Sequence, residues 1–239
     1  SSLHGAIMPA LLTGLSALTL LAVATPAAAQ SMAGGDWAFG VGAGTDNRSK
    51  DVSKSGTDAW GWALAEWTSG DGFFYTGAGA ETIDSSGSDL EIEAGVGIRP
   101  QWGGFDFDLN ATHKWRVDAN PGTDDDAWEF TADVSRAIGP AKGKLRLQYS
   151  PDGTGSTETW TWVEARASWD LTLTTAISAG IGRREQDLSV DYTDWDAGVT
   201  WQLTPAIDLD VRYHDTDADP SLFGDQYGSA VVANVGFYF

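Results

Sequence analysis

The chain has 239 residues, with 34 acidic and 14 basic side chains, and its formal net charge is −20. So acidic a chain is excluded as a nucleic-acid binder, because a phosphate backbone requires a basic surface. The absence of cysteine excludes disulfides, thiol catalysis and cysteine-bound metals. Only three histidines are present, and the sequence suggests no metal or cofactor site.

Residues 1–29 have the pattern of a secretory signal peptide. The apolar run 6–25 is followed by three alanines at 27–29, which fit an A-x-A cleavage site. A transmembrane anchor is the alternative, because the run is nearly long enough to span a bilayer. We expect the mature chain to be a single domain over residues 30–239. A secreted chain without cysteine suits a bacterial envelope.

Alternation of apolar and polar residues dominates the mature chain and predicts an all-β fold. Strands are expected, in chain order, at 36–45, 57–68, 73–82, 90–98, 105–115, 128–135, 143–150, 158–169, 173–183, 194–202, 207–214 and 231–239. The alternation is clearest at 90–98, 105–115, 128–135, 194–202, 207–214 and 231–239. For 57–68 the sequence does not decide which face is apolar.

The connections between these strands alternate in length. Compact turns are expected at 69–72, 99–104, 137–143, 170–172 and 202–205. Longer polar loops are expected at 46–56, 83–88, 116–126, 150–157, 184–192 and 215–227. An even number of strands, joined by short turns at one end and longer loops at the other, is typical of outer-membrane barrels. The sequence therefore predicts a transmembrane antiparallel up-and-down β-barrel of about 12 strands.

Alternation alone does not show which face meets water, since a soluble barrel such as a lipocalin also alternates. The apolar face of the clear strands carries almost no charge, whereas the other face carries charges of both signs, too many for a dry core. We therefore expect the apolar face to contact lipid. Register is then strongly specified, since a slip by one residue would move charges into the membrane.

Tryptophans favour the expected strand ends and predict two interfacial girdles. The lower girdle would hold Trp37, Trp67, Trp102, Trp169 and Trp201. The upper girdle would hold Trp60, Trp62, Trp115, Trp128, Trp160, Trp162 and Trp195. At the chain end, apolar residues occupy alternate positions, and we expect the barrel-assembly machinery to read Val235, Phe237 and Phe239.

Three short motifs resemble landmarks of the TorF-like family of small proteobacterial outer-membrane porins. They are Tyr149-Ser150-Pro151-Asp152, Tyr192-Thr193-Asp194-Trp195 and Tyr213-His214-Asp215-Thr216-Asp217. The resemblance extends over residues 36–239 and implies a small outer-membrane barrel, without naming a substrate. Residues 45–53 depart from the family's usual segment after the first strand, because its aromatics and its glycine are missing here. The resemblance therefore implies no role for the first loop.

Catalysis and metal binding have weak candidates. His113 has no serine beside it, as a lipase-like site would require. His214 with Asp215 and Asp217 is the candidate for a protease-like pair at the barrel mouth. The acidic stretch 215–219 is no EF-hand loop, since Pro220 and Gln226 occupy the sixth and twelfth positions. Loose divalent binding there or at 124–126 is the alternative to a solvated acidic loop.

These observations favour a bacterial outer-membrane channel for small hydrophilic solutes, and not an enzyme. The expected pore-lining residues are Glu91, Glu93, Asp106, Asp108, Lys114, Glu129, Asp133, Lys144, Arg146, Glu164, Arg166, Arg184, Asp194, Asp196, Asp208, Asp210 and Arg212. Acids outnumber bases among them, so mild cation preference is expected. The alternatives are a plugged barrel with a structural or surface-interaction role and, third, an outer-membrane hydrolase. The expected partners are outer-membrane lipid and lipopolysaccharide, the assembly machinery and the solutes, but no nucleic acid.

Overall fold

The computed structural model describes residues 34–239, and the predicted signal peptide lies outside them. Twelve long antiparallel strands form the body of the molecule, as the alternation predicts. They are β1 (Gly35–Gly44), β4 (Trp60–Ser69), β5 (Phe74–Ser85), β6 (Ser88–Ile98), β8 (Phe105–Val117), β9 (Asp126–Ile138), β10 (Ala141–Gly153), β11 (Glu158–Asp170), β12 (Thr175–Gln186), β13 (Tyr192–Thr204), β14 (Ile207–Thr216) and β15 (Ala230–Tyr238). The short elements are β2 (Arg48–Ser49), β3 (Val52–Ser53), β7 (Gln101–Trp102), α1 (Pro220–Phe223) and η1 (Asp225–Tyr227).

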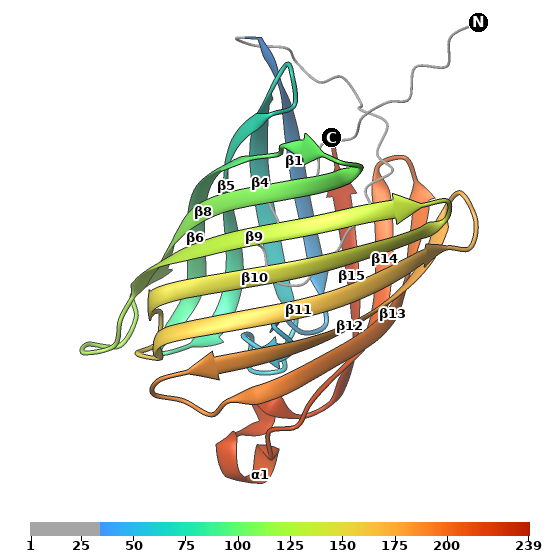
Figure 1. Cartoon of the computed structure of the whole chain (residues 1–239). Coiled ribbons are helices and arrows are strands. Elements are labelled where there is room, and N and C mark those ends of the chain that lie inside the picture. The colour runs from blue at the N-terminus through green and yellow to red at the C-terminus, as the bar shows by residue number, and fades with distance from the viewer. Residues whose placement is uncertain (1–33) are drawn as a thin grey trace, which may run out of the picture.

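The strands close into a barrel (Figure 1). Each long strand pairs with its sequence neighbour among the long strands, and β1 pairs with β15, from Gly40 opposite Tyr238 to Gly44 opposite Asn234. The end that carries α1 also carries most of the longer loops. Because outer-membrane barrels have short periplasmic turns and longer external loops, we take this end as the outer mouth.

Two expected loops are shorter than predicted. The connection expected at 150–157 is reduced to 154–157, since β10 continues to Gly153 and β11 begins at Glu158. The connection 83–88 is not a long loop, since β5 continues to Ser85 and β6 begins at Ser88. Ser86 and Gly87 alone form the turn, with φ of 57° and 78°. Two residues with positive φ match the right-handed twist of a tight hairpin, and serine followed by glycine tolerates that conformation.

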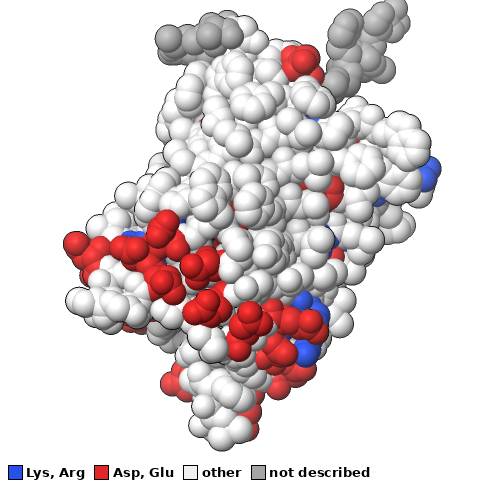
Figure 2. Space-filling model, turned by 60° about the vertical axis from the view of Figure 1, so that its left-hand side comes forward, with Lys and Arg blue, Asp and Glu red and all other residues white. Residues whose placement is uncertain are grey.

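The barrel has inverted polarity, as the alternation predicts. Large apolar side chains such as Val96, Phe130, Leu145 and Val163 face outward and are between 45% and 56% exposed. On the face shown in Figure 2, acidic side chains gather toward the α1 end, below a broad uncharged zone. An apolar outer wall around a charged interior suits lipid and places the barrel in a bacterial outer membrane. Within residues 34–239, no helix is long and apolar enough to cross a membrane.

The prediction of two tryptophan girdles is partly wrong. Trp60, Trp62, Trp160 and Trp162 point into the barrel and are between 3% and 6% exposed. The register gives the reason, since Trp62 lies opposite Glu81 and Trp162 opposite Gln148, on the polar side of the wall. A Cβ on Gly42 would come within 2.5 Å of the Trp62 ring, so glycine on β1 makes the room that this indole needs.

Candidate functional site: the barrel interior and its inserted loop

The connection between β1 and β4 folds into the barrel instead of extending into solvent. We call residues 45–59 the inserted segment; it contains β2 and β3. Its buried polar residues are Asp46, Asn47, Arg48, Lys50, Asp51, Ser53 and Ser55. Asn47 is completely buried although it lies in a loop. A buried loop requires partners for its polar groups, and the barrel wall and other loops supply them.

Two contacts hold the inserted segment to the outer mouth. Arg48 Nη1 donates to the Gly228 carbonyl at 2.8 Å, beside η1. The Tyr192 hydroxyl on β13 donates to the Lys50 carbonyl at 3.1 Å. Arg48 also pairs with Asp46 at 2.6 Å, so its charge is compensated within the segment. These contacts fix the segment against β13 and the last outer loop.

Asp51 joins the inserted segment to β14. Its Oδ1 lies 2.5 Å from His214 Nδ1, and both side chains are almost fully buried. Burial, followed by the negative charge of Asp196, raises the pKa of the Asp51 carboxyl above its ordinary value. Because both side chains are buried, either of them would cost folding free energy without its partner. Loss of this hydrogen bond should therefore destabilise the position of the inserted segment.

This placement of His214 does not fit the protease-like candidate. His214 faces the interior and is 2% exposed, not on the rim. Asp215, one position further, lies on the other face and accepts from the Tyr213 hydroxyl. Asp217 accepts from the Thr193 backbone at 2.7 Å. The alternation of the strand separates the histidine from both acids, so the structure does not assemble that site.

One residue of the acidic stretch 215–219 caps a helix. Asp219 accepts from the backbone and the hydroxyl of Ser221 at the start of α1. Within residues 34–239, no group of three or more His, Asp or Glu side chains is arranged to hold a metal ion.

Below the inserted segment, charges on the inner wall are extensively paired. At the inner end, Arg99 forms a forked pair with Glu66 at 2.9 and 3.0 Å and contacts Asp108 at 3.2 Å. Asp133 and Arg146 form a forked pair at 2.6 and 2.7 Å between β9 and β10. A chain of ion pairs then continues around the wall through Lys144, Glu164, Arg166, Asp196, Arg212 and Asp210.

Every expected pore-lining residue has interior parity, but their burial differs. Those buried within the barrel are Glu91, Glu93, Asp108, Lys114, Glu129, Asp133, Arg146, Glu164, Asp194, Asp196, Asp208, Asp210 and Arg212. Arg166 has a side chain 7% exposed. Lys144 and Arg184 are partly buried, and Asp106 is exposed at the inner rim.

Nine further interior charges were not on that list. From the wall and its turns they are Glu66, Glu81, Arg99 and Arg116; from the inserted segment they are Asp46, Arg48, Lys50, Asp51 and Lys54. Glu66 and Glu81 lie on strands whose alternation is less regular. On β4, the even spacing of Glu66 from Trp60 was the available signal, because it puts both side chains on one face. With all nine included and Asp106 counted at the rim, these residues comprise fifteen carboxylates and eleven bases, a formal charge of −4.

The proposed assembly signal faces lipid. Val235, Phe237 and Phe239 are between 43% and 51% exposed on the outside of the barrel. The Phe239 ring stacks on Phe39, with centroids 5.8 Å apart, and the two residues exchange backbone hydrogen bonds. The last residue thus completes the seam between β15 and β1.

The sequence profile of the family described as "Bacterial protein of unknown function (Gcw_chp)" matches residues 31–238. The chain belongs to the Gcw_chp family. No curated protein matches it.

Several solved outer-membrane barrels share the fold of this Gcw_chp protein. The KdgM porin is 6% identical with a TM-score of 0.58, covering 84% of this chain and 99% of KdgM. The NanC porin is 10% identical with a TM-score of 0.57, covering 84% and 98%. The COG4313 outer membrane channel from Pseudomonas putida F1 is 10% identical with a TM-score of 0.52, covering 90% and 98%. At these identities the likeness concerns the fold.

Proposed function

We propose that this Gcw_chp protein is a narrow passive channel for small hydrophilic solutes, mildly cation-preferring and constricted by its inserted segment. The observation that carries the proposal is the charged interior of a lipid-facing barrel. Its polar side chains extend from Arg99 at the inner end to Lys50 at the outer mouth. Twelve strands enclose more space than in the smallest barrels, whose interiors side chains fill. Porins and channels among the solved barrels of this fold support the proposal.

The second candidate is a plugged barrel with a structural or surface-interaction role. Burial supports it, since Glu66 and Asp194 are each 1% exposed and the inserted segment occupies the outer mouth. The two candidates differ in whether the inserted segment leaves a water-filled path beside the ion pairs. Burying charged groups costs desolvation free energy. We rank the channel first, because a conducting pore gives these charges a role that a plugged barrel does not require.

Other observations support the remaining parts of the proposal. The three motifs at 149–152, 192–195 and 213–217 support kinship with the TorF-like porins. The apolar wall supports contact with outer-membrane lipid and lipopolysaccharide, and the exposed chain end supports recognition by the assembly machinery. A non-enzymatic role is proposed because the strand separates His214 from Asp215 and Asp217.

Liposome swelling tests the proposal. Proteoliposomes that contain the purified barrel are placed in isosmotic arabinose, glucose or sucrose. A narrow channel predicts swelling that slows with solute size, and fastest entry for arabinose. Swelling no faster than in protein-free liposomes for all three sugars would contradict the channel and favour the plugged barrel.

A further inference from the structure

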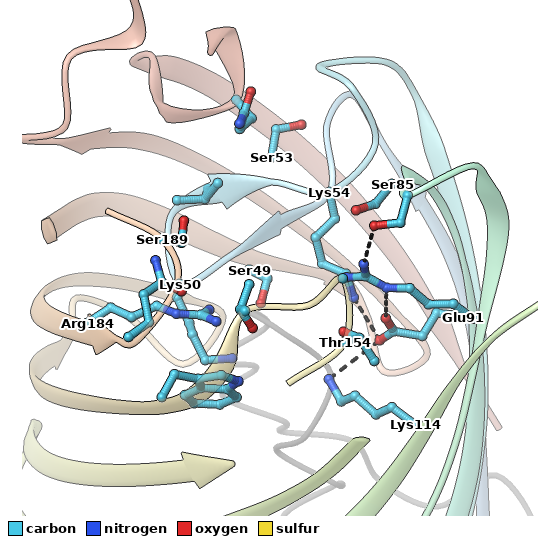
Figure 3. A pocket seen from close by; sticks show the side chains of 18 of the residues that line it. Ser49, Lys50, Ser53, Lys54, Ser85, Glu91, Lys114, Thr154, Arg184 and Ser189 are labelled. Atoms are coloured by element: carbon cyan, nitrogen blue, oxygen red, sulfur yellow. Dashed lines mark hydrogen bonds and ion pairs between the residues drawn. The ribbon is translucent and has the colours of Figure 1, made fainter. Parts of the chain in front are cut away.

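A cavity of about 240 Å³ lies between the inserted segment and the inner wall at the outer mouth. Figure 3 shows that Lys50 and Arg184 lie on one side of it, whereas Lys54, Glu91 and Lys114 lie on the other. At about 30 Å³ per water molecule, the volume equals about eight waters, which limits a guest to a small solute.

The cavity is basic although the chain is acidic. Five bases line it, against the two carboxylates of Glu91 and Glu129; the bases are Lys50, Lys54, Lys114, Arg116 and Arg184. Such a local excess of positive charge attracts anions within an interior that is negative overall.

On one side of the cavity, the bases are already compensated. Lys54 pairs with Glu81 and, at 2.8 Å, with Glu91. Arg116 also contacts Glu91, at 3.3 Å. Lys114 lies between 3.4 and 3.6 Å from three glutamates, which are Glu91, Glu93 and Glu129. These bases have little capacity left for a guest.

On the other side, two bases lack full partners. Arg184 makes no hydrogen bond and no ion pair with any residue of the described chain 34–239; its buried Nε has no acceptor, and its Cζ lies 4.4 Å from the Trp160 ring centroid. Lys50 Nζ lies 4.4 Å from the same centroid, and its ion pair with Glu129 is 4.0 Å long. Trp160 thus supports two cations that no carboxylate neutralises closely.

The electrostatic state of Lys50 agrees with this description. Burial lowers the pKa of its ammonium from 10.5 to about 7, and the nearby charge of Arg184 acts in the same direction. A buried cation in such a place is costly unless an anion accompanies it.

The remaining walls offer hydroxyl groups. Seven serine and threonine side chains line the cavity; they are Ser49, Ser53, Ser85, Ser86, Thr154, Thr157 and Ser189. The buried Thr157 Oγ1 has no hydrogen-bond partner. Hydroxyls that both donate and accept suit a guest that carries hydroxyls of its own.

We propose that this cavity binds a small hydroxylated organic anion, with Arg184 and Lys50 holding its carboxylate or phosphate and the serine–threonine wall contacting its hydroxyls. A guanidinium presents a fork of donors that matches two oxygens of one anion. This assignment rests on the proposed function and adds a local site to it: the cavity at the mouth binds an organic anion, whereas the interior as a whole is negative and favours small inorganic cations.

Equilibrium binding to the whole barrel, purified in detergent, tests the site. Glucuronate and glucose 6-phosphate are titrated separately by calorimetry, and glucose is the neutral control. We expect one or both anions to bind at least tenfold more tightly than glucose. The better anion identifies whether carboxylate or phosphate is preferred. Equal affinity for glucose and the two anions, or no binding of either anion, would overturn the proposal.

Variants locate the site. Arg184→Gln should weaken anion binding at least tenfold, because it removes the fork and its charge. Arg183→Gln is the matched control, since Arg183 is the next residue on β12 but faces outward with a side chain 46% exposed; it should bind like the unmodified protein. Arg184→Lys should recover part of the affinity, which separates anion recognition from damage to the fold. Unchanged binding in Arg184→Gln would contradict the assignment.

The binding assay requires no conduction and is therefore separate from the channel proposal. A barrel that binds glucuronate but passes no solute would contradict the channel alone. A barrel that conducts but binds neither anion would contradict this site alone.

Discussion

Asp51, in the inserted segment, and His214, on β14, are 163 positions apart in the chain and lie with Oδ1 and Nδ1 2.5 Å apart inside the barrel. This contact fastens the first loop to β14, which lies two strands from β1 around the wall. The segment thereby covers the ion-paired interior and also forms one side of the basic cavity. Its position links the channel proposal to the anion-site proposal.

The seam between β15 and β1 gives the first prediction. Deleting Phe239 removes the stacking on Phe39, the closing backbone hydrogen bonds and the terminal aromatic that we expect the assembly machinery to read. We expect a lower amount of the protein in the outer membrane, measured by immunoblot of membrane fractions. Replacing Phe239 with Tyr retains an aromatic ring and should retain the normal amount. Unchanged levels and normal heat-modifiable migration of the deletion variant would count against this role.

The second prediction concerns the two faces of β14. Leu209→Arg places a charge in the lipid-facing wall and should destabilise the inserted barrel by about 2–4 kcal/mol near the midplane. Asp210→Asn should be tolerated better, because Asp210 faces the interior, where Thr200 and Arg212 contact it. Folding into lipid vesicles, followed by gel mobility against urea, compares the two. A larger loss for Asp210→Asn would mean that the faces are reversed.

Ion selectivity gives the third prediction. The interior, with Asp106 counted at its rim, has a formal charge of −4, and Asp124, Asp125 and Asp126 add negative charge at the outer mouth. A negative interior with low-dielectric walls concentrates cations, although paired charges such as Asp133 and Arg146 reduce the effect. We expect mild cation preference in the reversal potential under a KCl gradient, decreasing as salt screens the field. Anion preference at low salt would contradict it.

The fourth prediction is a pH dependence of anion binding. The pKa of Lys50 is lowered to about 7, so the unliganded side chain loses its charge as pH rises through 7. A bound anion favours the protonated form, and binding above pH 7 therefore requires proton uptake. The charged groups around Lys50 are Glu129 on β9, Lys114 on β8, Arg184 on β12 and Lys54 in the inserted segment.

Affinity for glucuronate should thus fall by up to about tenfold per pH unit above 7. Calorimetry at pH 6, 7.5 and 9 measures the fall, since the glucuronate carboxylate stays ionised throughout. Lys50→Arg keeps its charge over this range and should show nearly constant affinity. Constant affinity in the unmodified protein would show that Lys50 does not take part in anion binding.

Alternation was sufficient to predict the wall of the barrel. Strand 207–214 shows why. A slip by one residue would move Asp210 to the lipid face and Leu209 to the charged interior, and the free-energy cost of that exchange leaves a single register. The same reasoning predicted Glu164 and Arg166 on the inner face, and each side chain is 7% exposed.

The interior tryptophans and the inserted segment were not predictable in this way. An indole near a strand end is compatible with a membrane interface or with the lumen, and the choice for Trp62 depends on a neighbouring glycine across the strands. The inserted segment is held by contacts with distant residues, such as His214 and Gly228, which no local pattern reveals. In sequence, its many charged residues, including Lys50 and Asp51, look like those of an ordinary solvent-exposed loop.

Single-channel recording in planar bilayers tests the central claim most directly. The unmodified barrel is compared with a variant in which residues 46–55 are replaced by a short Gly-Ser linker. Because these residues occupy the outer mouth, we predict a small conductance for the unmodified barrel and a conductance several-fold larger for the variant. Asp51→Asn with His214→Ala weakens one anchor and should give an intermediate or flickering conductance. Absence of conductance in both the unmodified barrel and the linker variant, with both correctly folded, would contradict the account.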